Sequence, residues 1–237
     1  MLRHWPGLWQ ATRAALLAGA FALAFSFAAD AAKKEPQAVR TPAQLMQELA
    51  QPGPLPEMTL GKDDAPVTIV EYADLTCPHC AAFHANVLPL LKQRYIDTGK
   101  ARLVFREFPL NTHSLIAFMS VRCVSPREAQ PLVASLFAHQ DDWTQPRSMQ
   151  ELTGKLRALG EQAGVAGHAF DGCLPSGPAP STDREKQLVK DIVAVRDRAD
   201  KEFGVNATPT FFVNGVKLPG PTIQDFEKAI AAALPKP

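Results

Sequence analysis

Hydrophobic and polar positions change period several times along the chain, and each change predicts a different element. Residues 67–72 form a short apolar run typical of a buried strand. Apolar residues then recur at spacings of three and four from 83 to 91, which predicts an amphipathic helix. Because Pro89 interrupts this helix, we expect a kink or break near Leu88. Residues 101–107 form a second apolar run, so a parallel strand pair with a right-handed helical crossover is predicted.

The stretch from 111 to 203 has the helical period almost throughout. It has no repeated unit, so we interpret it as an all-helical block and not as a repeat array. Beyond a first helix from about Leu115, the predicted helices are 126–140, 149–162, a short one at 169–174, and a last one whose apolar stripe runs from Leu188 to Phe203.

The C-terminal part returns to strands. Two apolar runs, 209–213 and 216–218, flank Asn214-Gly215, and this dipeptide between apolar runs is the strongest short signal for a β-hairpin. Thr222 is a suitable N-cap for a final amphipathic helix. The predicted order is β-α-β, a helical block, then β-β-α, which places the chain in the α/β class.

The N-terminal 60 residues differ in composition from the rest. Arg3 and Arg13 precede an uncharged stretch that ends in Ala29-Asp30-Ala31, and this pattern predicts a secretory signal peptide over residues 1–31. The stretch is shorter than the ~20 residues of a bilayer span, although an uncleaved membrane anchor is the alternative. Residues 32–60, rich in proline, are expected to be an N-terminal arm or linker, with an oligomerisation arm as the alternative.

Overall composition excludes little. The 237 residues are 46% hydrophobic and 21% charged, as in ordinary globular proteins. The formal net charge of +1 gives no global reason to expect nucleic acid as a partner.

The candidate chemistry lies at the turn between the first strand and its helix, in Cys77-Pro78-His79-Cys80. With Cys77 as N-cap, Pro78 occupies the first helical position, where its missing N–H costs nothing. Unpaired backbone N–H groups and the helix dipole then favour a thiolate at Cys77, which is the reactive form of cysteine. We interpret the motif as a redox site. The alternatives are a structural disulfide, half a zinc site, or a soft-metal site of Cys77, Cys80 and His84, although His84 is expected to lie at the surface.

The sequence contains four cysteines, which allow three disulfide connectivities. If Cys77 and Cys80 are a redox dithiol, Cys123 and Cys173 remain to pair with each other. Closing that loop would stabilise the fold, and a regulatory disulfide is the alternative interpretation.

The element order, the Cys-x-x-Cys motif and Thr208-Pro209 before the hairpin together resemble the thioredoxin fold. With its helical insertion and the motif Cys77-Pro78-His79-Cys80, the chain is similar to the DsbA-type thiol:disulfide oxidoreductases of the bacterial periplasm. The resemblance covers roughly residues 60–235 by motif order. The corresponding domains are a thioredoxin domain at 61–110 and 204–237 and an all-helical insertion at 111–203.

The resemblance also implies roles for single residues. Cys77 would be the attacking cysteine, Cys80 its resolving partner, and Pro209 a cis-proline facing them. Glu71 would be a buried acid that accepts the proton of Cys80, with a solvent-facing edge position as the alternative. The Cys123–Cys173 pair fits the second disulfide of the α-proteobacterial type.

Two further residues bear on the direction of the reaction. The His79 imidazole at the helix start could donate to the Cys77 thiolate and stabilise the reduced state. Thr208 departs from the valine of the prototype oxidase, and its hydroxyl could tune the couple. Because related isomerases and reductases often carry threonine there, both directions stay open.

The function that follows is a secreted disulfide oxidase without a cofactor. Its expected partners are reduced unfolded secreted proteins and, by resemblance, a DsbB-like membrane protein that reoxidises it. We expect a periplasmic monomer that binds no nucleic acid. The alternatives are an isomerase or reductase of the same fold and a soft-metal-binding protein.

Overall fold

The computed structural model describes residues 40–51, 53–177 and 179–235, so the predicted signal peptide lies outside the described residues. Within them, the strands form a five-stranded sheet in the order β1-β3-β2-β4-β5. β2 and β3 are parallel, as predicted, and the other neighbouring pairs are antiparallel. The strands are β1 (Met58–Leu60), β2 (Val67–Ala73), β3 (Ala101–Glu107), β4 (Thr210–Val213) and β5 (Val216–Lys217).

β1 is an element that the sequence pattern does not predict. Its residues pair with β3 at the edge of the sheet, with Met58 opposite Phe105. A strand of three residues is too short to display a period of two, which explains why it was missed. Part of the predicted arm at 32–60 therefore belongs to the sheet.

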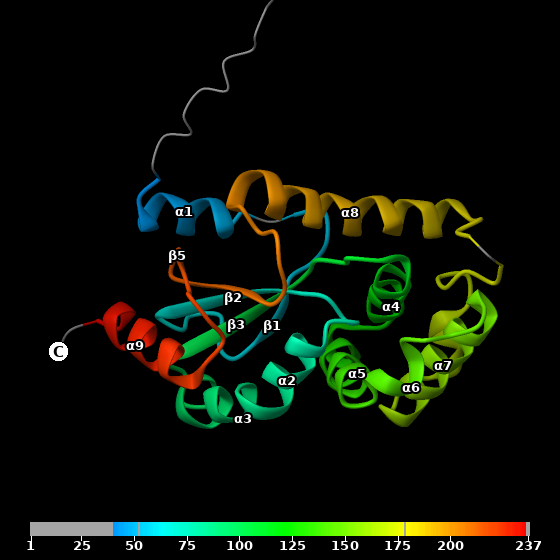
Figure 1. Cartoon of the computed structure of the whole chain (residues 1–237), viewed down its shortest axis with the longest axis horizontal. Helices are drawn as coiled ribbons and strands as arrows, with labels where there is room; N and C mark the ends of the chain where they lie inside the picture. The colour runs from blue at the N-terminus through cyan, green and yellow to red at the C-terminus, as the bar shows by residue number, and fades with distance from the viewer. Residues whose placement is uncertain (1–39, 52, 178, 236–237) are drawn as a thin grey trace, which may run out of the picture. The chain divides into compact units, whose positions relative to one another are not determined.

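The two faces of the sheet are covered by different helices (Figure 1). Val67 and Ile69 of β2 pack on one side, and Val70 and Tyr72 on the other, as the alternation of a strand requires. By the same alternation Glu71 belongs to the side of Val67. The helices on that side are α2 (Pro78–Asn86), α3 (Leu88–Leu91) and α9 (Ile223–Ala233), and those on the other are α1 (Pro42–Leu49) and α8 (Asp183–Phe203).

The predicted break before Pro89 is present. α2 ends at Asn86, α3 begins at Leu88, and a π-helical turn, η1 (Lys92–Ile96), completes the connection to β3. Pro89 lies in the first turn of α3, where a missing N–H is tolerated.

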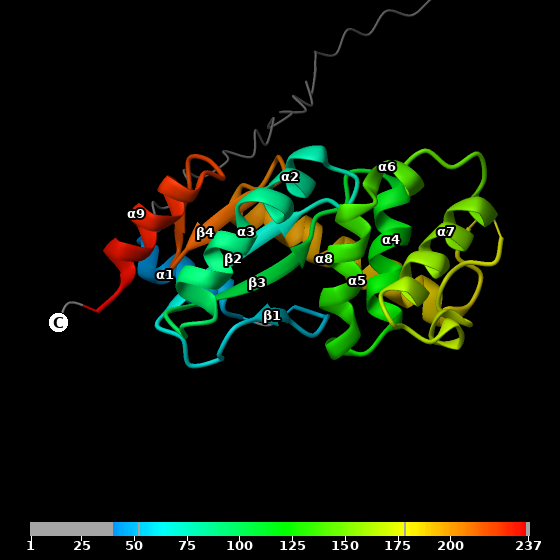
Figure 2. The same cartoon turned by 90° about the horizontal axis from the view of Figure 1, so that it is seen from below.

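The helical block consists of α4 (Thr112–Cys123), α5 (Pro126–Ala138), α6 (Gln140–Trp143), α7 (Met149–Gln162) and the 3-10 turn η2 (Gly167–Phe170) (Figure 2). The short helix predicted at 169–174 is thus a 3-10 turn that begins earlier. Trp143 is fully buried and its indole N–H donates to the Leu136 carbonyl at 2.9 Å. It acts as a packing anchor.

α8 joins the block to the sheet. Ile192 is buried with the helical block, whereas Ala199 and Phe203 pack with Val70 and Tyr72 of β2. Gly204 ends the helix in the left-handed conformation, with φ of 61°. Across the described residues, no helix combines the length and the apolar character needed to cross a membrane.

Candidate active site

Cys77 lies at the start of α2, in the position expected from the sequence. It is the N-cap residue, with extended φ and ψ of −78° and 120°, and Pro78 occupies the first turn. Cys80 follows within that turn and is fully buried, while Cys77 is half-buried, and both are free thiols. One sulfur is therefore accessible and the other is shielded behind it.

The surroundings of Cys77 favour its ionised form. Its pKa is lowered to about 5, first by the thiol of Cys80, then by Thr208 and by the backbone N–H groups of Cys80 and His79, against the effect of burial. The sulfur of Cys77 lies 3.4 Å from the carbonyl oxygen of Thr208. The Thr208 hydroxyl is buried without a partner beside the thiol form, so it is available to donate to the thiolate.

The surroundings of Cys80 favour its neutral form. Its pKa is raised first by Cys77, then by burial and by the Glu71 carboxylate. Two sulfurs in one helical turn thus differ strongly in acidity. Thr208, whose carbonyl oxygen lies beside the Cys77 sulfur, is joined to Pro209 by a cis peptide bond.

Glu71 is fully buried on β2, which lies between β3 and β4. The alternative of a solvent-facing edge position is therefore ruled out. The prediction of a surface position for His84 is wrong: its side chain is only 8% exposed, and Nε2 lies 3.1 Å from both carboxylate oxygens of Glu71. Glu71 was expected to be a buried acid near Cys80, but its pairing with His84 was not predicted.

The chain is similar to known proteins over most of its length. A family model described as thioredoxin matches residues 55–232. The chain belongs to the thioredoxin family and is of the DsbA type. The crystal structure of Wolbachia pipientis alpha-DsbA1 is similar with a TM-score of 0.67 and 31% identity, over 79% of this chain and 95% of that one.

Two curated relatives are provisionally named protein-disulfide oxidoreductases. The one from Rickettsia bellii is 32% identical over 179 residues, which are 75% of this chain and 64% of the relative. The one from Rickettsia prowazekii is 34% identical over 179 residues, which are 75% of this chain and 61% of the relative. The chain thus spans less than two thirds of the length of either.

The remaining predicted site residues of this DsbA-type chain lie at the surface. Pro78 and His79 are exposed at the start of α2. His79 acts on Cys77 through its backbone N–H. The role suggested for its imidazole remains a prediction.

Two residues that position the active-site loop were not predicted. The buried Asp74 carboxylate accepts hydrogen bonds from the N–H of Thr76 at 2.6 Å and from the N–H of Leu110 at 2.6 Å. Gln140 of the helical block donates to the carbonyls of Leu75 and Cys77 at 2.9 and 3.0 Å. The Asp-x-Thr spacing is a local turn signal that could have identified Asp74. No local signal marks Gln140.

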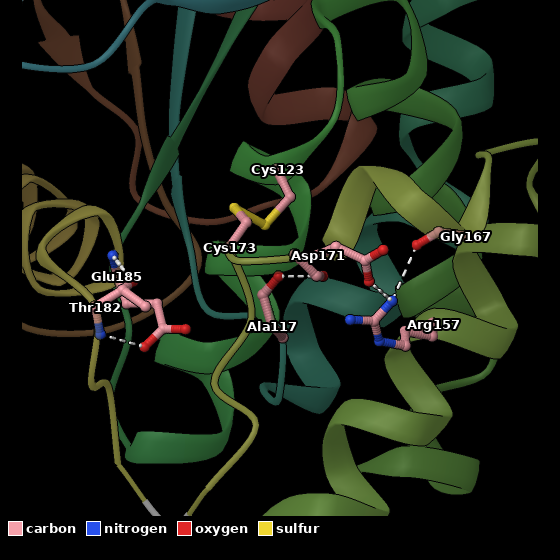
Figure 3. The surroundings of a disulfide bond; sticks show 9 residues. Ala117, Cys123, Arg157, Gly167, Asp171, Cys173, Thr182 and Glu185 are labelled. Carbon is pink, nitrogen blue, oxygen red and sulfur yellow. Dashed lines mark hydrogen bonds and ion pairs between the residues drawn. A yellow bond between two sulfur atoms is a disulfide. The ribbon is translucent and has the colours of Figure 1, made fainter.

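Cys123 and Cys173 form a disulfide within the helical block, with Cα atoms 5.8 Å apart (Figure 3). Arg157 donates to the Gly167 carbonyl at 2.9 Å and pairs with Asp171 at 3.0 Å, so the segment before Cys173 is held to α7 (Figure 3). Among the described residues, no group of three or more His, Cys, Asp or Glu side chains is placed to hold a metal ion.

Proposed function

We propose that the protein is a thiol:disulfide oxidoreductase that donates a Cys77–Cys80 disulfide to the thiols of unfolded secreted proteins. The observation that carries the proposal is the unequal acidity of the two cysteines: the pKa of Cys77 is about 5, whereas that of Cys80 is raised. A dithiol of this kind has one good nucleophile and leaving group at the surface and one shielded partner.

The reaction proceeds by two exchanges. A substrate thiolate attacks the sulfur of Cys77 in the oxidised protein, the Cys77–Cys80 bond breaks, and Cys80 leaves as a thiolate that takes up a proton. A second substrate thiolate attacks the substrate sulfur of the mixed disulfide, and Cys77 leaves as a stable thiolate. Two electrons pass to the protein and one disulfide forms in the substrate.

The direction of transfer follows from the stability of the reduced form. Hydrogen bonds to the Cys77 thiolate stabilise the dithiol, and this makes the disulfide a better oxidant; DsbA is the reference example of such a couple. Turnover then requires reoxidation of Cys77 and Cys80, for which a DsbB-like membrane partner is proposed. The proposed location is the periplasm, reached through the predicted signal peptide at 1–31.

The test is oxidative refolding of a reduced model protein. Cys77→Ser is expected to abolish disulfide transfer, because the attacked sulfur is lost. Cys80→Ser cannot form the Cys77–Cys80 disulfide, so it is also expected to transfer none to the reduced protein; offered a substrate that already carries a disulfide, its Cys77 thiolate should attack that bond and form a mixed disulfide that accumulates instead of resolving. Full transfer by Cys77→Ser would refute the proposal.

Thr208 supports a second candidate, an isomerase or reductase of the same fold, because its hydroxyl lies beside the Cys77 sulfur in place of a valine. Acid trapping of cells followed by thiol labelling separates the two. An oxidase is recovered mainly as the Cys77–Cys80 disulfide, and an isomerase or reductase mainly as the dithiol.

A further inference from the structure

The Glu71 and His84 side chains form a buried pair between β2 and α2. Nε2 of His84 lies 3.1 Å from each oxygen of the Glu71 carboxylate, which has no exposed surface. Cys80 and His84 are four residues apart on α2, a spacing that places both side chains on one face of the helix. Both therefore face the carboxylate of β2.

Aromatic rings hold the imidazole in place. The His84 ring lies 4.2 Å from the ring of Phe137 and 5.7 Å from the ring of Phe105, measured between centroids. Phe137 comes from α5 of the helical block and Phe105 from β3. This packing restricts the ring to the orientation in which Nε2 contacts Glu71.

The other side of His84 adjoins a cavity. This cavity of about 130 Å³ is lined by His84 and by apolar side chains that include Ala134 and Leu88. It is large enough to admit water, and the His84 imidazole is the polar side chain in its lining. A shallower surface pocket shares these three residues and adds the charged Lys92 and Asp97, so it extends the cavity toward solvent.

We propose that Glu71 and His84 form the proton path between Cys80 and solvent, with His84 as the residue that exchanges protons with water in the cavity. The inference rests on the proposed function and deepens it. Cys80 is buried, so its sulfur has no direct access to water. The Glu71 carboxylate is close enough to raise the pKa of Cys80, which supports its place as the first acceptor.

In each half-reaction one proton moves along this path, either to Cys80 or away from it. When substrate attack on Cys77 releases Cys80 as a thiolate, one proton passes from water through His84 and Glu71 to the sulfur. During reoxidation Cys77 is first joined to a sulfur of the oxidant in a mixed disulfide. The Cys80 thiol then gives its proton to Glu71 while His84 passes a proton to water. The resulting Cys80 thiolate attacks the Cys77 sulfur, and the oxidant's sulfur leaves as a thiolate.

Few other ionisable groups face this path. Glu71 lies on β2 and Cys80 on α2, while Lys92 and Asp97 line the outer pocket. The facing surfaces of β3 and α5 contribute Phe105, Phe137 and Ala134, which carry no charge. His84 is therefore the titratable side chain placed between Glu71 and the cavity.

The experiment follows the disulfide state of Cys77 and Cys80 over time after the reduced protein is mixed with oxidised glutathione. The first phase is attack by Cys77, and the second is attack by Cys80 on the Cys77–glutathione disulfide, which requires loss of the Cys80 proton. We expect His84→Gln to slow the second phase by about tenfold or more at neutral pH, with the first phase unchanged. His84→Ala should be slowed in the same way, and added imidazole should restore its second phase by entering the enlarged cavity.

The matched control is His139→Gln, because His139 is about half exposed and pairs with Asp142. It should react at the rate of the unmodified protein and be insensitive to imidazole. A second phase of normal rate in His84→Gln, or a slow phase in His84→Ala that imidazole leaves unchanged, would overturn the inference. Neither result touches the proposed function, which is tested separately by disulfide transfer from the unmodified protein and from Cys77→Ser.

Discussion

The thiol of Cys80 is the largest influence that lowers the pKa of Cys77. Replacing Cys80 with alanine removes this donor and leaves Thr208 and the helix N–H groups in place. Cys80→Ser is the matched variant, because its hydroxyl retains a donor at nearly the same position. The pair of variants isolates a single hydrogen bond to the thiolate.

The size of the effect follows from the strength of that bond. A hydrogen bond to a charged group contributes about 1.5–3 kcal/mol, and a pKa change of one unit corresponds to about 1.4 kcal/mol. Because Cys77 is half-buried, water screens part of the interaction and the lower end of the range applies. We expect the pKa of Cys77 to rise from about 5 to about 6 in Cys80→Ala, and to stay near 5 in Cys80→Ser.

The assay is the ultraviolet absorbance of the thiolate against pH. In both variants Cys77 is the one free cysteine, because Cys123 and Cys173 are joined, so the titration reports a single group. Equal midpoints for the two variants would show that Cys80 does not stabilise the thiolate. A midpoint near 9 in the Cys80→Ser variant would refute the account of the whole site.

Two predictions concern stability. Cys77 ionises at about pH 5 in the folded reduced protein and near 9.0 in the unfolded chain, so between these values the unfolded state binds one more proton. The unfolding free energy of the reduced form should therefore rise with pH across this window relative to that of the oxidised form. Urea titrations of both forms at several pH values measure the two free energies. A difference between the two forms that does not change with pH would count against the depressed pKa of Cys77. Replacing Cys123 and Cys173 together by alanine should lower the unfolding free energy by up to about 4 kcal/mol in the chain-entropy model, because the bridged residues are 50 apart. Urea denaturation tests this, and a loss below about 1 kcal/mol would contradict that origin of the stability.

Residues that act through neighbours in sequence were predictable. Cys77, Pro78 and Cys80 occupy a helix start whose capping and dipole depend on local order. The hairpin at Asn214-Gly215 likewise follows from local backbone preference, with positive φ at both residues. Spacing alone therefore located the redox motif on its helix.

Residues that act through partners distant in the sequence were not predictable. His84 lies one helical turn after Cys80, but only the pairing of β2 with β3 and β4 places the Glu71 carboxylate against its imidazole. Gln140 holds the carbonyl of Cys77 from 63 residues away. Nothing in a local pattern of apolar and polar positions encodes such contacts.

The sequence therefore predicted the order of most strands and helices, although not β1, and the place of two cysteines at one helix start, because short-range sterics, hydrogen bonding and side-chain period decide those features. Tertiary packing alone decided which carboxylate lies behind Cys80, which imidazole pairs with that carboxylate, and how the helical block holds the active-site loop. The physical reason is that burial and electrostatic coupling depend on distances between segments, and those distances exist only once the sheet and its helices have assembled.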